Sequence, residues 1–218
     1  MQSARDQSKE FKKSRLLRYK AFSQETGRPN TKKFKEVNLL FDKSRQLKKL
    51  GVLLRACAKC TDLNVPGVTE SALGYGNPNS QVFFVGQSLC TLCMATQIPF
   101  TMGSGYAIDA ALALSGLTRR DVFMSSVVHC HPLKNRSSSS REIKNCLLFL
   151  YKEIEIVKPE IIICLGADAA RVMKKQIQYI KTDAEVVNVK HPASFLYSNG
   201  PGVFDWIVNL SMEMYKWI

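Results

Sequence analysis

The polar and apolar positions along the chain follow two periods, one typical of strands and one typical of helices. Short runs rich in Val, Ile and Phe predict β-strands at residues 81–86, 122–128, 160–165 and 185–189. Apolar residues at every third or fourth position predict helices at residues 106–115, 141–157, 167–176 and 203–217. Strands that alternate with helices are typical of a parallel sheet covered on both faces. We therefore predict an α/β fold of three layers, α/β/α, around a central, mainly parallel four-stranded sheet.

The N-terminal quarter has a different pattern, dominated by lysine and arginine. An imperfect apolar stripe predicts a basic helix over residues 1–26, and a second helix is predicted from Thr31 to about Leu54. The first 60 residues hold 17 Lys and Arg against 5 Asp and Glu, which is nearly all of the net charge of +13. This asymmetry favours a polyanionic partner, nucleic acid before an anionic membrane surface; the alternative is a solvated helix pair that only aids solubility. We predict a basic helical extension at 1–54 and an α/β domain at 55–218.

Composition narrows the class of protein. A chain of 218 residues with 45% hydrophobic and 22% charged residues can bury one substantial core. No apolar run approaches the roughly 20 residues of a membrane-spanning helix, and the charged N-terminus is unlike a secretory signal. We expect a monomer in the cytoplasm, associated with the nucleoid if the source is bacterial or viral. There, the seven cysteines are expected to be reduced thiols or metal ligands rather than disulfides.

The chemistry-bearing residues gather at the predicted C-terminal ends of the strands. In parallel sheets, ligands bind at that edge. The strand ends are Gly86-Gln87-Ser88, Ser125–Cys130, Leu165-Gly166 and His191-Pro192. Three of the four hold polar or sulfur groups, so we expect the functional site there.

Several short motifs follow one another in the order of a known family. Cys57 and Cys60 form a CxxC pair, and fifteen residues separate Cys130 from Cys146. The other motifs are Gly74-Tyr75-Gly76-Asn77-Pro78, Val85-Gly86, Pro99–Gly105, Val127–Pro132, Asn135-Arg136, Lys158-Pro159 and His191-Pro192. With this ordered set, residues 55–200 resemble the uracil-DNA glycosylase superfamily, specifically its iron–sulfur class (families four and five).

The resemblance implies a metal centre. It assigns the four ligands of a [4Fe–4S] cluster to Cys57, Cys60, Cys130 and Cys146. The alternative is a zinc site in which the second CxxC, Cys90 and Cys93, joins the first. Cys164 lies in an apolar strand and is expected to be a buried, inert thiol. The expected role of the cluster is structural.

The resemblance also implies an activity: a DNA glycosylase that flips out uracil or another altered base and hydrolyses its N-glycosidic bond, leaving an abasic site. His191 would face the base carbonyl or the adjacent phosphate, and Phe100 would stack on the base. The other implied residues are Gln87 and Ser88 in catalysis, Gly86 and Ser126 in base binding, and Pro192, Ser194, Asn135 and Arg136 in DNA binding.

Two departures from the class bear on the chemistry. The class usually has a Gly-Glu-x-Pro-Gly loop after its first strand, whereas residues 86–93 contain no carboxylate. Gln87 can orient water but cannot accept its proton. Ser126 stands where the class has an Asn that reads uracil, and one hydroxyl cannot make the same two contacts.

These departures leave other functions open. One is a diverged protein that binds or modifies an unusual DNA base without excising it, and another is an iron–sulfur protein with a structural or interaction role. The loop cysteines Cys90 and Cys93 also make a thiolate nucleophile conceivable, with a packing pair as the simpler alternative.

Overall fold

The computed structural model describes residues 31–196 and 202–217, with side chains from Asp42 onward. The predicted helix over residues 1–26 lies outside the described residues. The chain divides into two compact units, residues 1–41 and 42–218. In the first unit, the structure describes only the backbone of residues 31–41, which is helical. The predicted boundary after residue 54 stays a prediction.

A five-stranded sheet forms the centre of the second unit, in the order β1-β3-β2-β4-β5. Its strands are β1 (Tyr75–Gly76), β2 (Val82–Ser88), β3 (Phe123–Val128), β4 (Ile161–Leu165) and β5 (Glu185–Val189). The last four run parallel, which confirms the predicted mainly parallel sheet, while β1 pairs antiparallel with β3. The predicted count of four strands is wrong by one, because two residues are too few to show a strand period.

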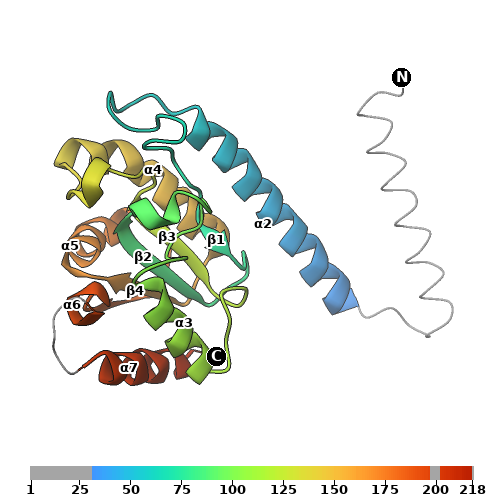
Figure 1. The fold of residues 1–218 in the computed structure, drawn as a ribbon. Coiled ribbons are helices and arrows are strands. Elements are labelled where there is room, and N and C mark those ends of the chain that lie inside the picture. The colour runs from blue at the N-terminus through green and yellow to red at the C-terminus, as the bar shows by residue number, and fades with distance from the viewer. Residues whose placement is uncertain (1–30, 197–201, 218) are drawn as a thin grey trace. The chain divides into compact units, whose positions relative to one another are not determined.

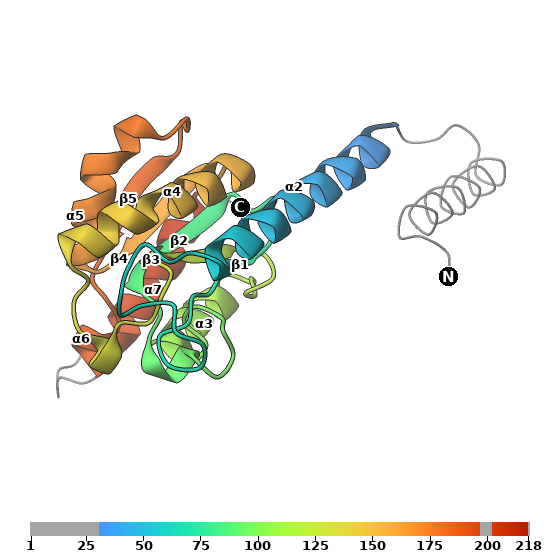
Figure 2. The ribbon, with the colours of Figure 1, turned by 90° about the horizontal axis from the view of Figure 1, so that it is seen from above.

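Helices cover both faces of the sheet, as predicted (Figures 1 and 2). One face packs against α3 (Gly105–Leu114) and α7 (Val203–Tyr215), and the other against α4 (Ser140–Val157) and α5 (Ala167–Gln176). The helix α2 (Thr31–Arg55) contributes Leu47, Leu50 and Leu54 to the core beside α4. The short helices are α6 (Ala193–Leu196), η1 (Thr91–Cys93), η2 (Leu133–Asn135) and η3 (Ile177–Tyr179).

The burial of the strands explains why their sequences are almost continuously apolar. All residues of β3 and β4 are buried, as expected for central parallel strands covered on both faces, whereas β5 at the edge is only partly buried. Because β2 to β5 run parallel, their C-terminal ends lie at one edge of the sheet. Among the described residues, no helix is both long and apolar enough to cross a membrane.

Candidate active site and metal centre

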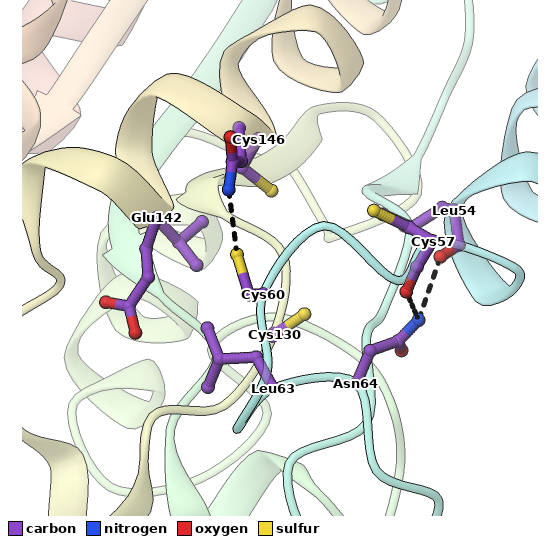
Figure 3. A pocket seen from close by; sticks show the side chains of 10 residues that line it. Leu54, Cys57, Cys60, Leu63, Asn64, Cys130, Glu142 and Cys146 are labelled. Carbon is purple, nitrogen blue, oxygen red and sulfur yellow. Dashed lines mark hydrogen bonds between the residues drawn. The ribbon is translucent and has the colours of Figure 1, made fainter.

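Four cysteines from three distant segments line one pocket beside the sheet. Figure 3 shows their sulfur atoms pointing into the same space. The four ligands predicted from the resemblance are the four found together: Cys57 and Cys60 after α2, Cys130 after β3, and Cys146 within α4. Leu54, Leu63 and Val128 supply the apolar part of the lining.

Backbone and amide N–H groups point at two of these sulfurs. Asn145 Nδ2 lies 3.4 Å from Cys60 Sγ, and the backbone N–H of His129 donates to Cys146 Sγ at 3.3 Å. Asn64 shapes the CxxC loop, because its side-chain amide donates to the carbonyls of Leu54 and Cys57 at 3.1 and 2.8 Å (Figure 3). N–H donors around sulfur stabilise thiolates, the form in which cysteine binds metal.

The donor set fits an iron–sulfur cluster. Burial, with the charges of Cys146, Cys57 and Cys60, raises the pKa of Cys130 to about 12. Four close thiolates are thus unfavourable by themselves, and a cationic centre would offset their repulsion. Within the described part of the chain, no three His, Cys, Asp or Glu residues are placed to hold a single metal ion. The residues present are those that a four-cysteine cluster requires.

A buried hydrogen-bond network continues from this pocket into the core. His129, fully buried, contacts Cys146 Sγ through Nδ1 at 3.4 Å and Glu153 through Nε2 at 3.0 Å. Burial opposes the charged imidazolium, but Glu153 and Cys146 outweigh it, so the pKa of His129 is raised. Glu153 also accepts from the hydroxyl of Ser125 and from the backbone N–H of Gly74, the latter at 2.6 Å. Sequence reasoning missed this network, whose members lie up to 79 residues apart.

A separate cleft of about 480 Å³ lies at the C-terminal ends of β2, β4 and β5. Such a volume is typical of sites for small ligands. It collects Gln87, Ser88, Phe100, Asn135 and His191 from the predicted site residues.

His191 follows β5 in the chain and lines the cleft, where it lies close to the backbone of Gly166. A side chain at Gly166 would place its Cβ 3.0 Å from His191 Cβ, and the φ of +94° at Gly166 suits glycine. The Nδ1 atom accepts the backbone N–H of Ala193 at 3.2 Å. Burial lowers the pKa of His191, so the ring is neutral at neutral pH. With Nδ1 as acceptor, the proton is on Nε2, which can donate to a ligand.

Phe100 lies on the floor of the cleft against Gly86. A Cβ at Gly86 would lie 2.5 Å from Phe100 Cζ, so only glycine allows the ring this position. Phe100 has a φ of +59°, and its carbonyl accepts from Arg119, whose guanidinium also pairs with Asp109 at 2.5 Å. The local backbone therefore fixes the ring, as a stacking surface requires.

Gln87 is hydrogen-bonded to a carboxylate that sequence reasoning missed. In the amide orientation that satisfies both of its ends, Gln87 donates to Asp168 Oδ2 at 3.3 Å and accepts from the N–H of Ser138 at 2.9 Å. Asp168 lies in the first turn of α5 and lines the cleft. The signal was in the sequence, since Asp168 follows the predicted strand end Leu165-Gly166 by two residues.

The remaining residues predicted to contact the base or the DNA lie outside the cleft lining. Ser126 pairs with Gly86 in the sheet; its buried hydroxyl has no hydrogen-bond partner among the described residues, and Ser126 is not part of the cleft lining. Arg136 is exposed but makes a two-point ion pair with Glu142. Pro192 is buried, whereas Ser194 is exposed and donates to the His191 carbonyl at 2.7 Å.

Cys90 and Cys93 do not join the cysteine pocket. Their sulfurs lie 2.7 Å apart, with Cys93 buried and Cys90 on the lining of the cleft. The hydrogen bond between them lowers the pKa of Cys93 to about 5 and raises that of Cys90. Each sulfur is thus engaged by the other, as in the packing pair that is the simpler alternative to a nucleophile. The structure does not assemble the zinc site predicted as an alternative.

The amino-acid sequence is similar to those of known proteins. Residues 73–209 match the family model described as the uracil DNA glycosylase superfamily. The chain belongs to this superfamily. It is 29% identical over 161 residues to a protein of Archaeoglobus fulgidus named "Type-4 uracil-DNA glycosylase", a match that covers 66% of this chain and 80% of the relative. A protein of the same name from Pyrobaculum aerophilum is 34% identical over 132 residues, 58% of this chain and 64% of the relative.

A second relative from Pyrobaculum aerophilum, named "Type-5 uracil-DNA glycosylase", is 31% identical over 118 residues, which is 52% of this chain and 50% of the relative. Membership in the superfamily confirms the resemblance seen in the motifs and the predicted α/β class. The roles of individual residues are not tested by these matches and stay predictions.

Proposed function

We propose that this member of the superfamily is a monofunctional DNA glycosylase that removes uracil or a related altered base from DNA. The relatives named uracil-DNA glycosylases support this activity. The single observation that carries it is the hydrogen bond from the Ala193 N–H to His191 Nδ1, which leaves a neutral donor facing the cleft.

His191 is proposed to stabilise the departing base. Breaking the N-glycosidic bond leaves negative charge on the base, and the N–H at Nε2 would donate to its carbonyl oxygen. A single preorganised donor in a site that excludes water lowers the barrier by about 2.7–4 kcal/mol. A neutral ring needs no proton from solvent before it donates, so the depressed pKa of His191 suits this role.

Phe100 is proposed to hold the base once it leaves the duplex stack. Glycosylases read a flipped base in a pocket and stack it on aromatic side chains. Gly86 leaves room for the ring, and Ser88 adds a hydroxyl to the same cleft. Asn135 Oδ1 accepts from the backbone N–H and hydroxyl of Thr91 at 2.9 and 3.1 Å, so it also fixes the rim where DNA would approach.

The cysteine pocket is proposed to hold a [4Fe–4S] cluster on Cys57, Cys60, Cys130 and Cys146. Bound there, the cluster would join the segment after α2 to the segment after β3 and to α4. The chemistry of excision does not pass through this pocket, because His191 and Phe100 lie in the separate cleft.

The test is base excision from defined oligonucleotides. Purified protein would be incubated with single- and double-stranded DNA bearing uracil, hypoxanthine, xanthine or hydroxymethyluracil, then treated with alkali to cut abasic sites. We expect strand cleavage at one or more of these bases and a loss of about 10²–10³-fold in His191→Ala. Absence of abasic product from every substrate would contradict a glycosylase.

One observation favours a second candidate, a protein that binds an unusual base without excising it. The Ser126 hydroxyl is buried without a partner among the described residues, and it stands where the class has an Asn. Because Ser126 is not part of the cleft lining, this position does not give the cleft the side-chain amide with which the class reads uracil. Tight, salt-dependent binding to modified DNA without abasic product would favour this candidate.

A further inference from the structure

The loop after β2 lacks the carboxylate that the class usually has, yet the cleft contains one from another strand end. Asp168 reaches the cleft from the first turn of α5, directly after β4. It lines the same cavity as His191 and Phe100. In a cleft proposed to take a base from DNA, a carboxylate weakens binding because it repels the phosphates.

This carboxylate has two neighbours, one at each oxygen. Asp168 Oδ1 pairs with Arg171 Nη2 at 2.6 Å, one turn along the helix. Asp168 Oδ2 accepts from the Gln87 side-chain amide at 3.3 Å. The pair with Arg171 is a surface contact that contributes little, since the Arg171 side chain is 62% exposed. The bond to Gln87 instead links the carboxylate to the end of β2.

Gln87 and Asp168 together can both orient a water molecule and accept its proton. Gln87 provides an amide oxygen and an N–H that can orient water, but it cannot take a proton. Asp168 has lone pairs beyond the two bonds described and can take one. Their contact lies at the position from which the class usually supplies a single glutamate.

We propose that Asp168 is the catalytic carboxylate of this enzyme and that, with Gln87, it holds the attacking water. This inference rests on the proposed glycosylase function. The water oxygen forms a bond to the C1′ carbon of the sugar, and the bond from C1′ to the base nitrogen breaks. Its electron pair leaves with the base, toward the His191 donor, while a proton of the water passes to the Asp168 carboxylate.

The proposal is tested by single-turnover excision with Asp168→Asn, which keeps the size of the side chain. We expect a rate about 100-fold below wild type, within the range for losing a general base. Affinity for a duplex with a tetrahydrofuran abasic-site analogue should stay within about threefold of wild type or improve, because a negative charge is lost beside the phosphates. The thermal midpoint should be unchanged within about 2 °C.

Arg171→Ala is the matched control, because it breaks the ion pair but leaves the carboxylate in place. We expect it to excise within about threefold of wild type. The double variant Gln87→Glu/Asp168→Asn, which moves the carboxylate to the position usual in the class, should recover at least tenfold over Asp168→Asn.

The outcomes separate the two proposals. Asp168→Asn excising within threefold of wild type, or Arg171→Ala losing as much as Asp168→Asn, would overturn the role of Asp168 and leave the glycosylase function intact. A double variant no faster than Asp168→Asn would also count against it. A wild-type protein that excises no base would overturn both.

Discussion

The cysteine pocket and the cleft differ in how deeply their residues are buried, although both lie beside the same sheet. In the pocket, Cys130 and Cys146 are 8% exposed and His129 beside them is 1% exposed, whereas Cys57 and Cys60 are half-buried. The cleft is formed by loops at strand ends, and several of its groups, such as Asn135, are exposed to solvent.

This difference predicts which measurement responds to which region. A buried, hydrogen-bonded thiol or carboxylate cannot be altered without leaving a partner unsatisfied, so changes near the pocket should appear in folding. The polar residues of the cleft lie in loops at strand ends, so changes to them should appear in excision. Of the two departures from the class, Gln87 lines the cleft, whereas Ser126 lies outside its lining.

The largest effect is expected from Cys130→Ser. Loss of one of four proposed ligands should remove the iron and most of the folded, recoverable protein, because the pocket joins three distant segments of the chain. Iron content and absorbance in the 400 nm region of anaerobically purified protein would measure the first, and the yield of monodisperse protein the second.

Cys164→Ser is the matched control for this change. Cys164 is fully buried in β4, away from the pocket lining, and burial raises the pKa of its thiol to about 12. We expect the full iron content and a modest loss of stability, from a hydroxyl in an apolar strand. Equal iron in Cys130→Ser and Cys164→Ser would contradict the assigned ligands.

A smaller effect is expected from Glu153→Gln, which tests how far the buried region extends. Glu153 is completely buried and serves His129, Ser125 and Gly74. Removing one partner of such a buried pair should lower the free energy of unfolding by about 3 kcal/mol. Urea denaturation would measure it under anaerobic conditions.

Glu155→Gln on the same helix is the control. Glu155 pairs with Lys152 at 2.7 Å in a partly exposed i,i+3 arrangement. Its loss should cost no more than about 0.5 kcal/mol. Equal stability of Glu153→Gln and Glu155→Gln would mean that the buried network does not stabilise the fold.

The same contrast explains what the sequence could and could not predict. Strands such as β4, with the sequence Ile-Ile-Ile-Cys-Leu, are defined by their own apolar residues, and the cysteines are marked by their type and spacing. The strand β1 was not predicted, because two residues are too few to show a strand period. These elements need only local information.

The contact between Gln87 and Asp168 needs more than local information. The two residues lie 81 positions apart and meet because β2 and β4 are neighbours in the sheet with parallel register. Likewise, Ser126 was predicted to bind the base from its position in a motif, but the direction of its side chain depends on the pleat of β3. Periodicity does not give the order of the strands in the sheet. The contact of Gln87 with Asp168 and the direction of the Ser126 side chain could therefore not be predicted from it.

The smallest effect is expected from Gly86→Ala, which tests the cleft without touching a polar group. The added Cβ would meet Phe100 Cζ at 2.5 Å, so the ring must turn or shift. A displaced side chain costs about 0.5–1.5 kcal/mol, which corresponds to at most about a tenfold slower excision. Gly51→Ala in α2, whose Cβ would meet Leu73 Cδ2 at an ordinary 3.5 Å, should leave excision unchanged and raise stability slightly. Excision by Gly86→Ala at the wild-type rate would mean that the ring of Phe100 is not where the base stacks.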